Sequence, residues 1–159
     1  MEEKAQLEAS EQHPLLRSAR KIIAKFKCLD VRRTALFYVN DLHFKLGGMH
    51  TQEDETEPYM ASLFIGRHAD ANIYFFRADN VTDQATTNVV IPKGELMISL
   101  GTKQLDDYYN LLKEEGRVNI VDPIEDKPWG YRQFEIEDLD GNKIQFFRFL
   151  EGGTPGDDD

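Results

Sequence analysis

Cysteine is almost absent from this chain of 159 residues, which contains only Cys28. A single cysteine excludes an intrachain disulfide and any cysteine-rich zinc site. Cys28 falls on the apolar side of an alternating segment, so we expect it to be a small buried side chain rather than a nucleophile. No apolar run approaches the ~20 residues that a membrane span requires, and the acidic beginning lacks the basic and apolar parts of a signal peptide. We therefore expect a soluble, cytoplasmic protein with no membrane partner.

Basic residues are scarce relative to acidic ones, with 19 Lys and Arg against 29 Asp and Glu and a formal net charge of −10. Binding to a phosphate backbone depends on many Lys and Arg contacts, so we expect no nucleic-acid partner. The excess of acid would suit a cationic ligand, although solubility alone also accounts for it. The sequence also has no G-x-S-x-G elbow, no P-loop and no G-x-G-x-x-G turn, so these motifs offer no catalytic site.

The clearest pattern in the chain lies at residues 128–151. Tyr131–Glu137 alternates apolar and polar side chains, which predicts a strand with two unlike faces. Asp140-Gly141 provides a two-residue turn, because glycine accepts the positive φ that such a connection needs. The alternation then resumes over residues 143–150. We predict a β-hairpin with the single tryptophan, Trp129, at its entrance.

The rest of the chain carries strand, helix and turn signals in a regular order. Strands are predicted at residues 22–29, 42–46, 59–66, 72–78, 95–100 and 118–121, and helices at residues 31–38 and 105–115. Asp30 is the expected N-cap of the first helix, and Gly116 is the expected end of the second. Gly47-Gly48 should end the second strand, residues 79–90 should be a linker, and residues 122–127 should be a loop.

Both halves of the chain share one predicted order, a strand, a helix and then three strands. The segment DANIYFFR at residues 70–77 corresponds to DGNKIQFFR at residues 140–148, an offset of about seventy positions. This repeat predicts an α+β fold of two βαβββ modules, at about residues 20–79 and 93–151, whose curved mixed sheets surround a concave cavity. Residues 1–19 would be a flexible lead-in, residues 20–151 one domain, and residues 152–159 a disordered acidic tail.

Strand parity separates two faces of each predicted sheet. One face is almost wholly apolar and should pack on the helices, at Ala24, Phe26, Cys28, Ile73, Phe75, Leu96, Ile98, Leu100, Phe134, Ile136, Ile144 and Phe146. The other face mixes aromatic and hydrogen-bonding side chains, as a ligand pocket does. Its candidate binding residues are Asn72, Tyr74, Phe76, Met97, Tyr131, Gln133, Glu135, Gln145 and Phe147. An ordinary solvated sheet face with aromatic cross-strand pairs is the alternative.

The arrangement resembles the vicinal oxygen chelate superfamily, which includes glyoxalases, extradiol dioxygenases and bleomycin resistance proteins. The resemblance covers about residues 20–151 and is most specific at residues 127–148. There the sequence is similar to the pattern PWG-x-x-x-F-x-x-x-D-x-x-G-N of bleomycin resistance proteins, at Pro128, Trp129, Gly130, Phe134, Asp138, Gly141 and Asn142. VVIP at residues 89–92 and LDDYY at residues 105–109 also look like that branch, and residues 37–47 resemble a segment shared across the superfamily.

In the metal enzymes of that superfamily, one side chain from each of the first, fourth, fifth and eighth strands binds the ion. The resemblance places Ile23, Asn72 or its neighbour Tyr74, Met97 and Gln145 at those positions. Isoleucine cannot bind a metal, methionine suits only soft ions, and amides are weak neutral donors. The four histidines fall in the lead-in, a turn or loops. We therefore expect no metal, no cofactor and no catalytic residue, as in the ligand-sequestering branch.

For that branch the resemblance implies a homodimer that holds a small molecule in grooves at the subunit interface. Trp129 matches the tryptophan of the PWG motif, whose ring would stack on a flat and possibly cationic heterocycle; packing at the entrance of the hairpin is its other interpretation. We expect a metal-free binding protein connected with antibiotic resistance. Two alternatives stay open, a glyoxalase-like lyase or an isomerase with Glu135 as base, and a regulatory domain whose cavity is filled by its own side chains.

Overall fold

A computed structural model describes residues 1–78 and 91–150 of the chain. The whole predicted linker at residues 79–90 and the whole predicted tail at residues 152–159 lie outside the described residues. The first βαβββ unit consists of β1 (Ile23–Cys28), α2 (Val31–Asn40), β2 (Lys45–His50), β3 (Met60–Ile65) and β4 (Ala71–Arg77). The second consists of β5 (Glu95–Ser99), α3 (Thr102–Glu115), β6 (Asn119–Asp126), β7 (Tyr131–Glu137) and β8 (Lys143–Phe149).

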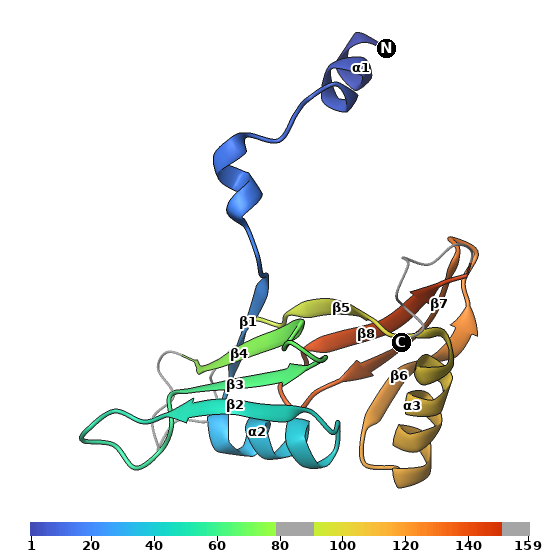
Figure 1. The fold of residues 1–159 in the computed structure, drawn as a ribbon. Coiled ribbons are helices and arrows are strands. Elements are labelled where there is room, and N and C mark those ends of the chain that lie inside the picture. Colours follow the sequence, from blue (N-terminus) through green and yellow to red (C-terminus); the bar gives the residue numbers. More distant parts are fainter. Residues whose placement is uncertain (79–90, 151–159) are drawn as a thin grey trace.

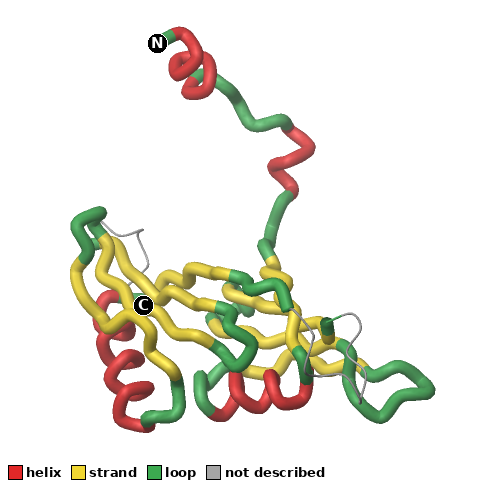
Figure 2. Tube along the Cα trace, turned by 180° about the vertical axis from the view of Figure 1, so that it is seen from behind, coloured by secondary structure: helices red, strands yellow, loops and turns green. Residues whose placement is uncertain are grey.

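The two units build two four-stranded sheets of the same topology, in the orders β1-β4-β3-β2 and β5-β8-β7-β6. In each sheet the edge strand at the start of the module is parallel to its neighbour, and the other pairs are antiparallel. Helices α2 and α3 lie on the same side of the two sheets (Figure 1). The tube view from behind shows the same two layers (Figure 2). The predicted α+β fold of two βαβββ modules is therefore confirmed.

The apolar face predicted from strand parity is the core of the protein. Phe26, Ile73, Phe75, Phe134 and Phe146 are all buried, and the other predicted members are buried or packed against this cluster. The Phe134 and Phe146 rings stack across β7 and β8 with centroids 5.2 Å apart. Side chains of one parity lie on one side of a strand, so the residues of the other parity lie on the sheet face away from the helices, called the open face below.

The helix ends follow the local sequence. The Asp30 side chain accepts a hydrogen bond of 3.0 Å from the backbone N–H of Arg33, so Asp30 caps α2 as predicted. Gly116 ends α3 in the left-handed conformation with φ of 66°, which a glycine adopts without strain.

Three local predictions were wrong. Gly47 and Gly48 lie inside β2, where the pairing with β3 shifts register between Leu46 and Gly48. The predicted loop at residues 122–127 is almost entirely part of β6, because β7 supplies hydrogen-bonding partners on either side of Pro123, which lies within the register irregularity between Asp122 and Glu125. The β7–β8 connection is the five-residue segment 138–142 rather than a two-residue turn, since Glu137 pairs with Lys143.

That connection, DLDGN, joins the second module to the first. The buried Asp138 carboxylate accepts hydrogen bonds from the Tyr38 hydroxyl at 2.7 Å and from the side-chain amide of Asn142 at 3.0 Å. The Asp140 carboxylate accepts from the backbone N–H of Leu29 at 3.1 Å and from the Thr34 hydroxyl at 3.3 Å. The loop thus fixes how the open faces of the two sheets lie relative to one another.

Residues 1–22 form an arm that leaves the body at the start of β1 (Figures 1 and 2). The arm contains a short helix α1 (Glu2–Glu8) and a 3-10 turn η1 (Pro14–Ser18), and none of the residues in either element is buried. Among the described residues, no helix is long and apolar enough to span a membrane.

Candidate functional site

A chain of amide and indole groups crosses the open face of the second sheet. The indole Nε1–H of Trp129 donates to the side-chain Oε1 of Gln133 at 3.2 Å, and the Nε2–H of Gln145 donates to the same oxygen at 2.8 Å. Gln133 is buried, whereas Trp129 leaves 58% of its surface exposed. A buried amide oxygen therefore orients an otherwise exposed indole ring.

Three aromatic rings lie beside this chain of hydrogen bonds. The Tyr131 ring centroid is 5.2 Å from that of Phe147 and 5.1 Å from that of Phe149. Phe147 and Phe149 contact edge to face at 5.4 Å. The spacing is that of favourable aromatic pairs, so these rings form a continuous apolar wall.

The entrance to the hairpin carries a positive charge close to the indole. The Lys127 ammonium lies 5.8 Å from the Trp129 ring centroid, a cation–π distance. It forms ion pairs with Glu125 and, at 3.0 Å, with Asp122, and hydrogen bonding to these carboxylates raises the pKa of Lys127. Lys127 thus stays protonated at neutral pH.

The open face of the first sheet is more basic. Asn72 accepts a hydrogen bond of 3.0 Å from the Ser62 hydroxyl, and Tyr74 lies between Ser62 on β3 and Lys25 on β1 in the sheet register. The Lys25 ammonium is 4.6 Å from the Phe76 ring centroid. Asn72, Tyr74 and Phe76 therefore form one group, separate from the group around Trp129.

One pocket connects the two modules. It has a volume of about 360 Å³ and lies between the edge strands β1 and β5, lined by Ile22 and Ala24 on one side and Leu96–Ser99 on the other. Asn72 and Met97, both predicted binding residues, meet at this pocket. We call it the seam pocket. A second hollow, the arm-root pocket, adjoins it at Ile22 and Asp70.

The predicted binding residues differ in accessibility. Gln133, Phe147 and Asn72 are buried. Trp129 and Met97 are exposed, and Tyr74, Phe76, Tyr131, Glu135 and Gln145 are half-buried. Gln133 would therefore position Trp129 and Gln145 rather than contact a ligand.

Sequence reasoning missed further residues of the open face. Met60, Ser62 and Phe64 on β3 stand in register with Phe76, Tyr74 and Asn72. These three residues alternate along β3 with a period of two, which is visible in the sequence. Sequence reasoning did not decide which side of β3 faces the core. Phe149, which the alternation in the sequence already places on the same side as Phe147, extends the aromatic wall.

The residues at the metal positions of the superfamily do not fit a divalent ion. Ile23 pairs with Asn72 in the β1–β4 register, and Met97 pairs with Gln145 in the β5–β8 register, as the strand assignment requires. Ile23 has no donor atom, and the Asn72 oxygen already accepts from Ser62. The remaining thioether and amide do not make a set of carboxylate and imidazole ligands. Within residues 1–78 and 91–150, no group of three His, Cys, Asp or Glu side chains is placed to hold a metal.

Solved structures with the same fold come from several bacteria. TioX from Micromonospora sp. ML1 is 20% identical, with a TM-score of 0.64 over 83% of this chain and 100% of that chain. A glyoxalase/bleomycin resistance protein/dioxygenase from Nocardioides is 19% identical, with a TM-score of 0.61 over 98% of this chain and 96% of that chain. The bleomycin-binding protein from bleomycin-producing Streptomyces verticillus, complexed with copper(II)-bleomycin, is 18% identical, with a TM-score of 0.54 over 81% of this chain and 95% of that chain.

No curated protein matches the sequence significantly. A family model does match it, across residues 28–146, which is well over half of its length. The chain belongs to the Glyoxalase/Bleomycin resistance protein/Dioxygenase superfamily.

Proposed function

We propose that this chain is a metal-free binding protein of the bleomycin resistance type. It sequesters a flat aromatic compound, neutral or cationic, in a groove between the open faces of two copies of the chain. The observation that carries the proposal is the exposed Trp129 ring, whose orientation is fixed by the buried Gln133 oxygen. An exposed indole held in one orientation loses little freedom when a flat ligand stacks on it.

The chemistry of the open face supports an aromatic ligand. Tyr131, Phe147 and Phe149 supply an apolar wall, and Gln145 and Glu135, which pair across β7 and β8, supply polar groups beside it. Apolar walls with a few fixed polar groups are typical of small-molecule sites. The Glu135 carboxylate is the group that would favour a cationic ligand over a neutral one.

The charges of the two open faces support a groove between copies. Lys25 and Lys27 lie on the first sheet, and Glu95 and Glu135 lie on the second. A twofold axis would place the first module of one copy opposite the second module of its partner. The basic open face of one would then lie opposite the acidic open face of the other. Each copy would contribute to both grooves.

The binding proposal is tested by titration with metal-free bleomycin, copper(II)-bleomycin and a planar cationic dye. Trp129 is the only tryptophan, so its fluorescence reports on the site alone. We expect saturable quenching by at least one of these compounds. Calorimetry on Trp129→Ala should give at least about tenfold weaker binding, because the stacking surface is lost. The absence of binding to all three would contradict the proposal.

A charge variant separates the cationic from the neutral ligand class. Glu135→Gln should weaken binding of the cationic dye and leave a neutral planar dye unaffected. Glu114→Gln, on the exposed surface of α3, is the matched control for loss of a carboxylate. Metal analysis of the isolated protein distinguishes the enzyme alternative, since stoichiometric zinc, nickel or iron would favour a lyase over the proposed binding protein.

A further inference from the structure

Among the described residues of β1 to β4, the open face of the first sheet carries no acidic side chain. The strand register gives its members as Ile23, Lys25, Lys27, Lys45, Gly48, His50, Met60, Ser62, Phe64, Asn72, Tyr74 and Phe76. The three lysines make this face basic in a protein whose formal net charge is −10. The excess of acidic residues therefore lies elsewhere on the molecule.

Two of these lysines converge on one aromatic ring. The Lys25 ammonium lies 4.6 Å from the Phe76 ring centroid, and the Lys27 ammonium lies 5.9 Å from it. Lys25 is exposed, whereas Lys27 and Phe76 are half-buried. Within residues 1–78 and 91–150, neither lysine forms an ion pair with a carboxylate. The ring attracts both cations to one place without neutralising their charge.

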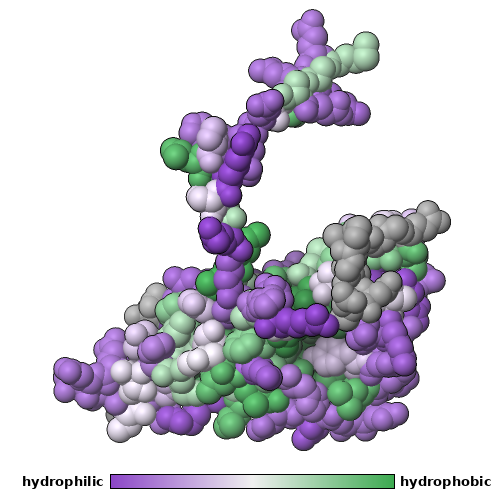
Figure 3. Space-filling view, viewed as in Figure 1, coloured by the Kyte–Doolittle hydropathy of each residue, from purple (hydrophilic) through white to green (hydrophobic). Residues whose placement is uncertain are grey.

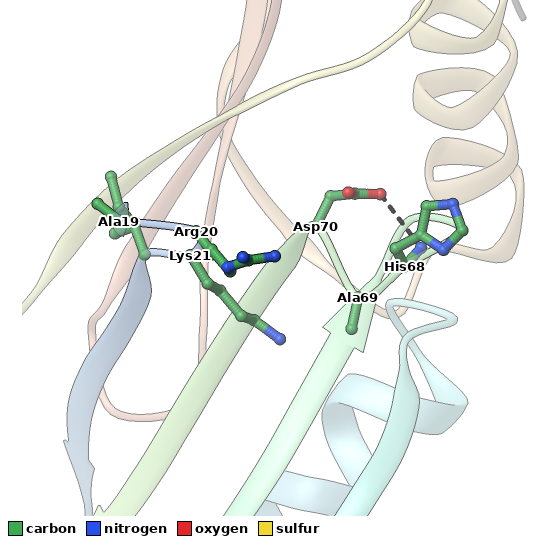
Figure 4. Close-up of a pocket in the computed structure, with 7 residues that line it drawn as sticks. Ala19, Arg20, Lys21, His68, Ala69 and Asp70 are labelled. Atoms are coloured by element: carbon green, nitrogen blue, oxygen red, sulfur yellow. Dashed lines mark hydrogen bonds between the residues drawn. The ribbon is translucent and has the colours of Figure 1, made fainter. Parts of the chain in front are cut away.

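The acidic residue at the start of β4 does not reach these cations. Asp70 stands six residues before Phe76, which is about 20 Å in an extended chain. Its carboxylate lines the arm-root pocket and accepts a hydrogen bond of 3.3 Å from the backbone N–H of His68. Figure 4 shows Arg20 and Lys21 on the other side of that pocket. Asp70 therefore belongs to the arm-root pocket, and it leaves the positive charge at Phe76 uncompensated.

Apolar side chains extend from the lysines across β4 and β3. Tyr74 pairs with Lys25 on one side and with Ser62 on the other, and Phe76 pairs with Met60. Met60, Tyr74 and Phe76 are half-buried, so each leaves part of its surface accessible. Neighbouring strands are about 5 Å apart, so these side chains cover an area that suits a ring system of two fused rings. Figure 3 shows apolar and hydrophilic surface side by side over the first module.

The internal repeat separates what the fold requires from what is particular to this face. The FFR segments of β4 and β8 match Phe76 with Phe147. The residue paired with Phe147 on β5 is Ser99, whereas the residue paired with Phe76 on β1 is Lys27. The second sheet has the same topology with a neutral residue at this position. Packing of the sheet therefore does not account for the lysine, and binding of an anion does.

We propose that the open face of the first module binds an aromatic anion, a fused ring system that carries a carboxylate, sulfonate or phosphate group. The acid group pairs with the ammonium groups of Lys25 and Lys27, and the rings lie on Tyr74 and Met60. Hydrogen bonds between charged groups are stronger than neutral ones, and the apolar surface beside them favours an aromatic anion over an inorganic one. The site uses one chain and does not include Trp129, so it is separate from the binding site proposed above.

Calorimetry with three probes tests the ligand class. Naphthalene-2-sulfonate should bind the full-length chain saturably, and inorganic sulfate and the cation 2-naphthyltrimethylammonium should bind at least about tenfold more weakly. Lys25→Gln with Lys27→Gln should weaken binding of the sulfonate by at least about tenfold. Lys103→Gln with Lys113→Gln on α3 is the matched control. It removes the same charge, and the Lys113 ammonium also lies over a ring, 5.9 Å from the Tyr109 centroid.

Nuclear magnetic resonance then locates the bound sulfonate. In nitrogen-15-labelled protein it should shift the amide resonances of Lys25, Ser62 and Tyr74 and leave that of Gln133 in place. Trp129→Ala should leave the affinity for the sulfonate unchanged, so failure of one site is distinguishable from failure of the other. Shifts confined to the second sheet would overturn the proposal.

The competing interpretation is that the two lysines pair with carboxylates of a second copy of the chain. Sedimentation equilibrium of the Lys25→Gln, Lys27→Gln variant separates the two roles. A dimer dissociation constant that rises while the affinity for the sulfonate stays unchanged would overturn the anion site and assign the lysines to the contact between copies. No binding of the sulfonate to the wild type, or equal binding of the cationic probe, would also overturn it.

Discussion

The Tyr38 hydroxyl on α2 donates a hydrogen bond of 2.7 Å to the Asp138 carboxylate, which stands a hundred positions later in the chain. Both groups are buried, and burial together with the nearby carboxylate raises the pKa of Tyr38 well above its usual value. The bond connects the helix of the first module to the last hairpin of the second. It therefore controls the relative placement of the two open faces.

Tyr38→Phe should destabilise the protein by about 1–3 kcal/mol, because it removes a hydrogen bond to a buried carboxylate. Tyr109→Phe is the matched control. Tyr109 is also a buried helix tyrosine, but its hydroxyl makes no hydrogen bond to the described residues. Urea unfolding of both variants measures the difference. Equal losses in the two variants would mean that the Tyr38–Asp138 bond contributes no net stability.

Asp140→Asn should change how stability depends on pH. Burial raises the pKa of Asp140 above its usual 3.8, despite the bonds from Leu29 and Thr34. A raised pKa means that the folded state holds the proton more tightly than the unfolded state. The stability that this protonation contributes is present below pH 3.8 and is lost as the pH rises through the folded pKa. Asparagine does not titrate, so the variant avoids that loss.

Melting temperatures measured from pH 3.5 to 7 check this effect. The melting temperature of Asp140→Asn should rise relative to that of the wild type as the pH increases above 3.8. At higher pH the difference in melting temperature should become constant. Asp107→Asn on the exposed side of α3 controls for the removal of a surface carboxylate. A difference in melting temperature that does not vary with pH would contradict the raised pKa of Asp140.

Gly94→Ala should weaken the contact between β5 and β1. A Cβ atom at Gly94 would lie 2.5 Å from the Phe26 ring, so the ring or the strand must shift, at a cost of about 1–3 kcal/mol. Gly48→Ala is the control in a strand, because its Cβ would have no neighbour closer than 3.8 Å. Thermal unfolding compares the two. Phe26→Leu, combined with Gly94→Ala, should restore part of the lost thermal stability. If the loss came only from the backbone at residue 94, Phe26→Leu would restore none of it.

Cys28 should not react with thiol reagents in the folded protein. It is fully buried, and burial raises the pKa of the thiol to about 12, so almost no thiolate forms at neutral pH. Its labelling rate by an aromatic disulfide should follow the rate of unfolding and increase in urea. Fast labelling in native buffer would contradict this prediction and show that β1 opens locally.

The prediction of the fold depended on signals that are local in the chain. Alternation with a period of two placed Phe26, Ile73 and Phe146 on the core side, and the capping residues Asp30 and Gly116 marked the helix ends. The structure confirms these assignments, since they follow from side-chain direction and backbone conformation. The internal repeat then predicted the two-module fold before any contact between modules was known.

Predictions failed where distant partners decide the conformation. Residues 122–126, DPIED, contain three acidic side chains and a proline, yet they belong to the edge strand that pairs with β7. The DLDGN segment looked like a simple turn because its partners Leu29, Thr34 and Tyr38 are about a hundred residues away. No local pattern contains that information.

The same division applies to the site. The sequence by itself determined which side chains share the open face of each strand and which residue types occupy the metal positions, because both depend only on parity and composition. Only the tertiary structure decided that Gln133 is buried beneath Trp129, that Asn72 and Met97 border one pocket, and that the leucines of the arm are left uncovered. These relationships arise where strands and modules pack together, and packing is a property of residues that are distant in the chain.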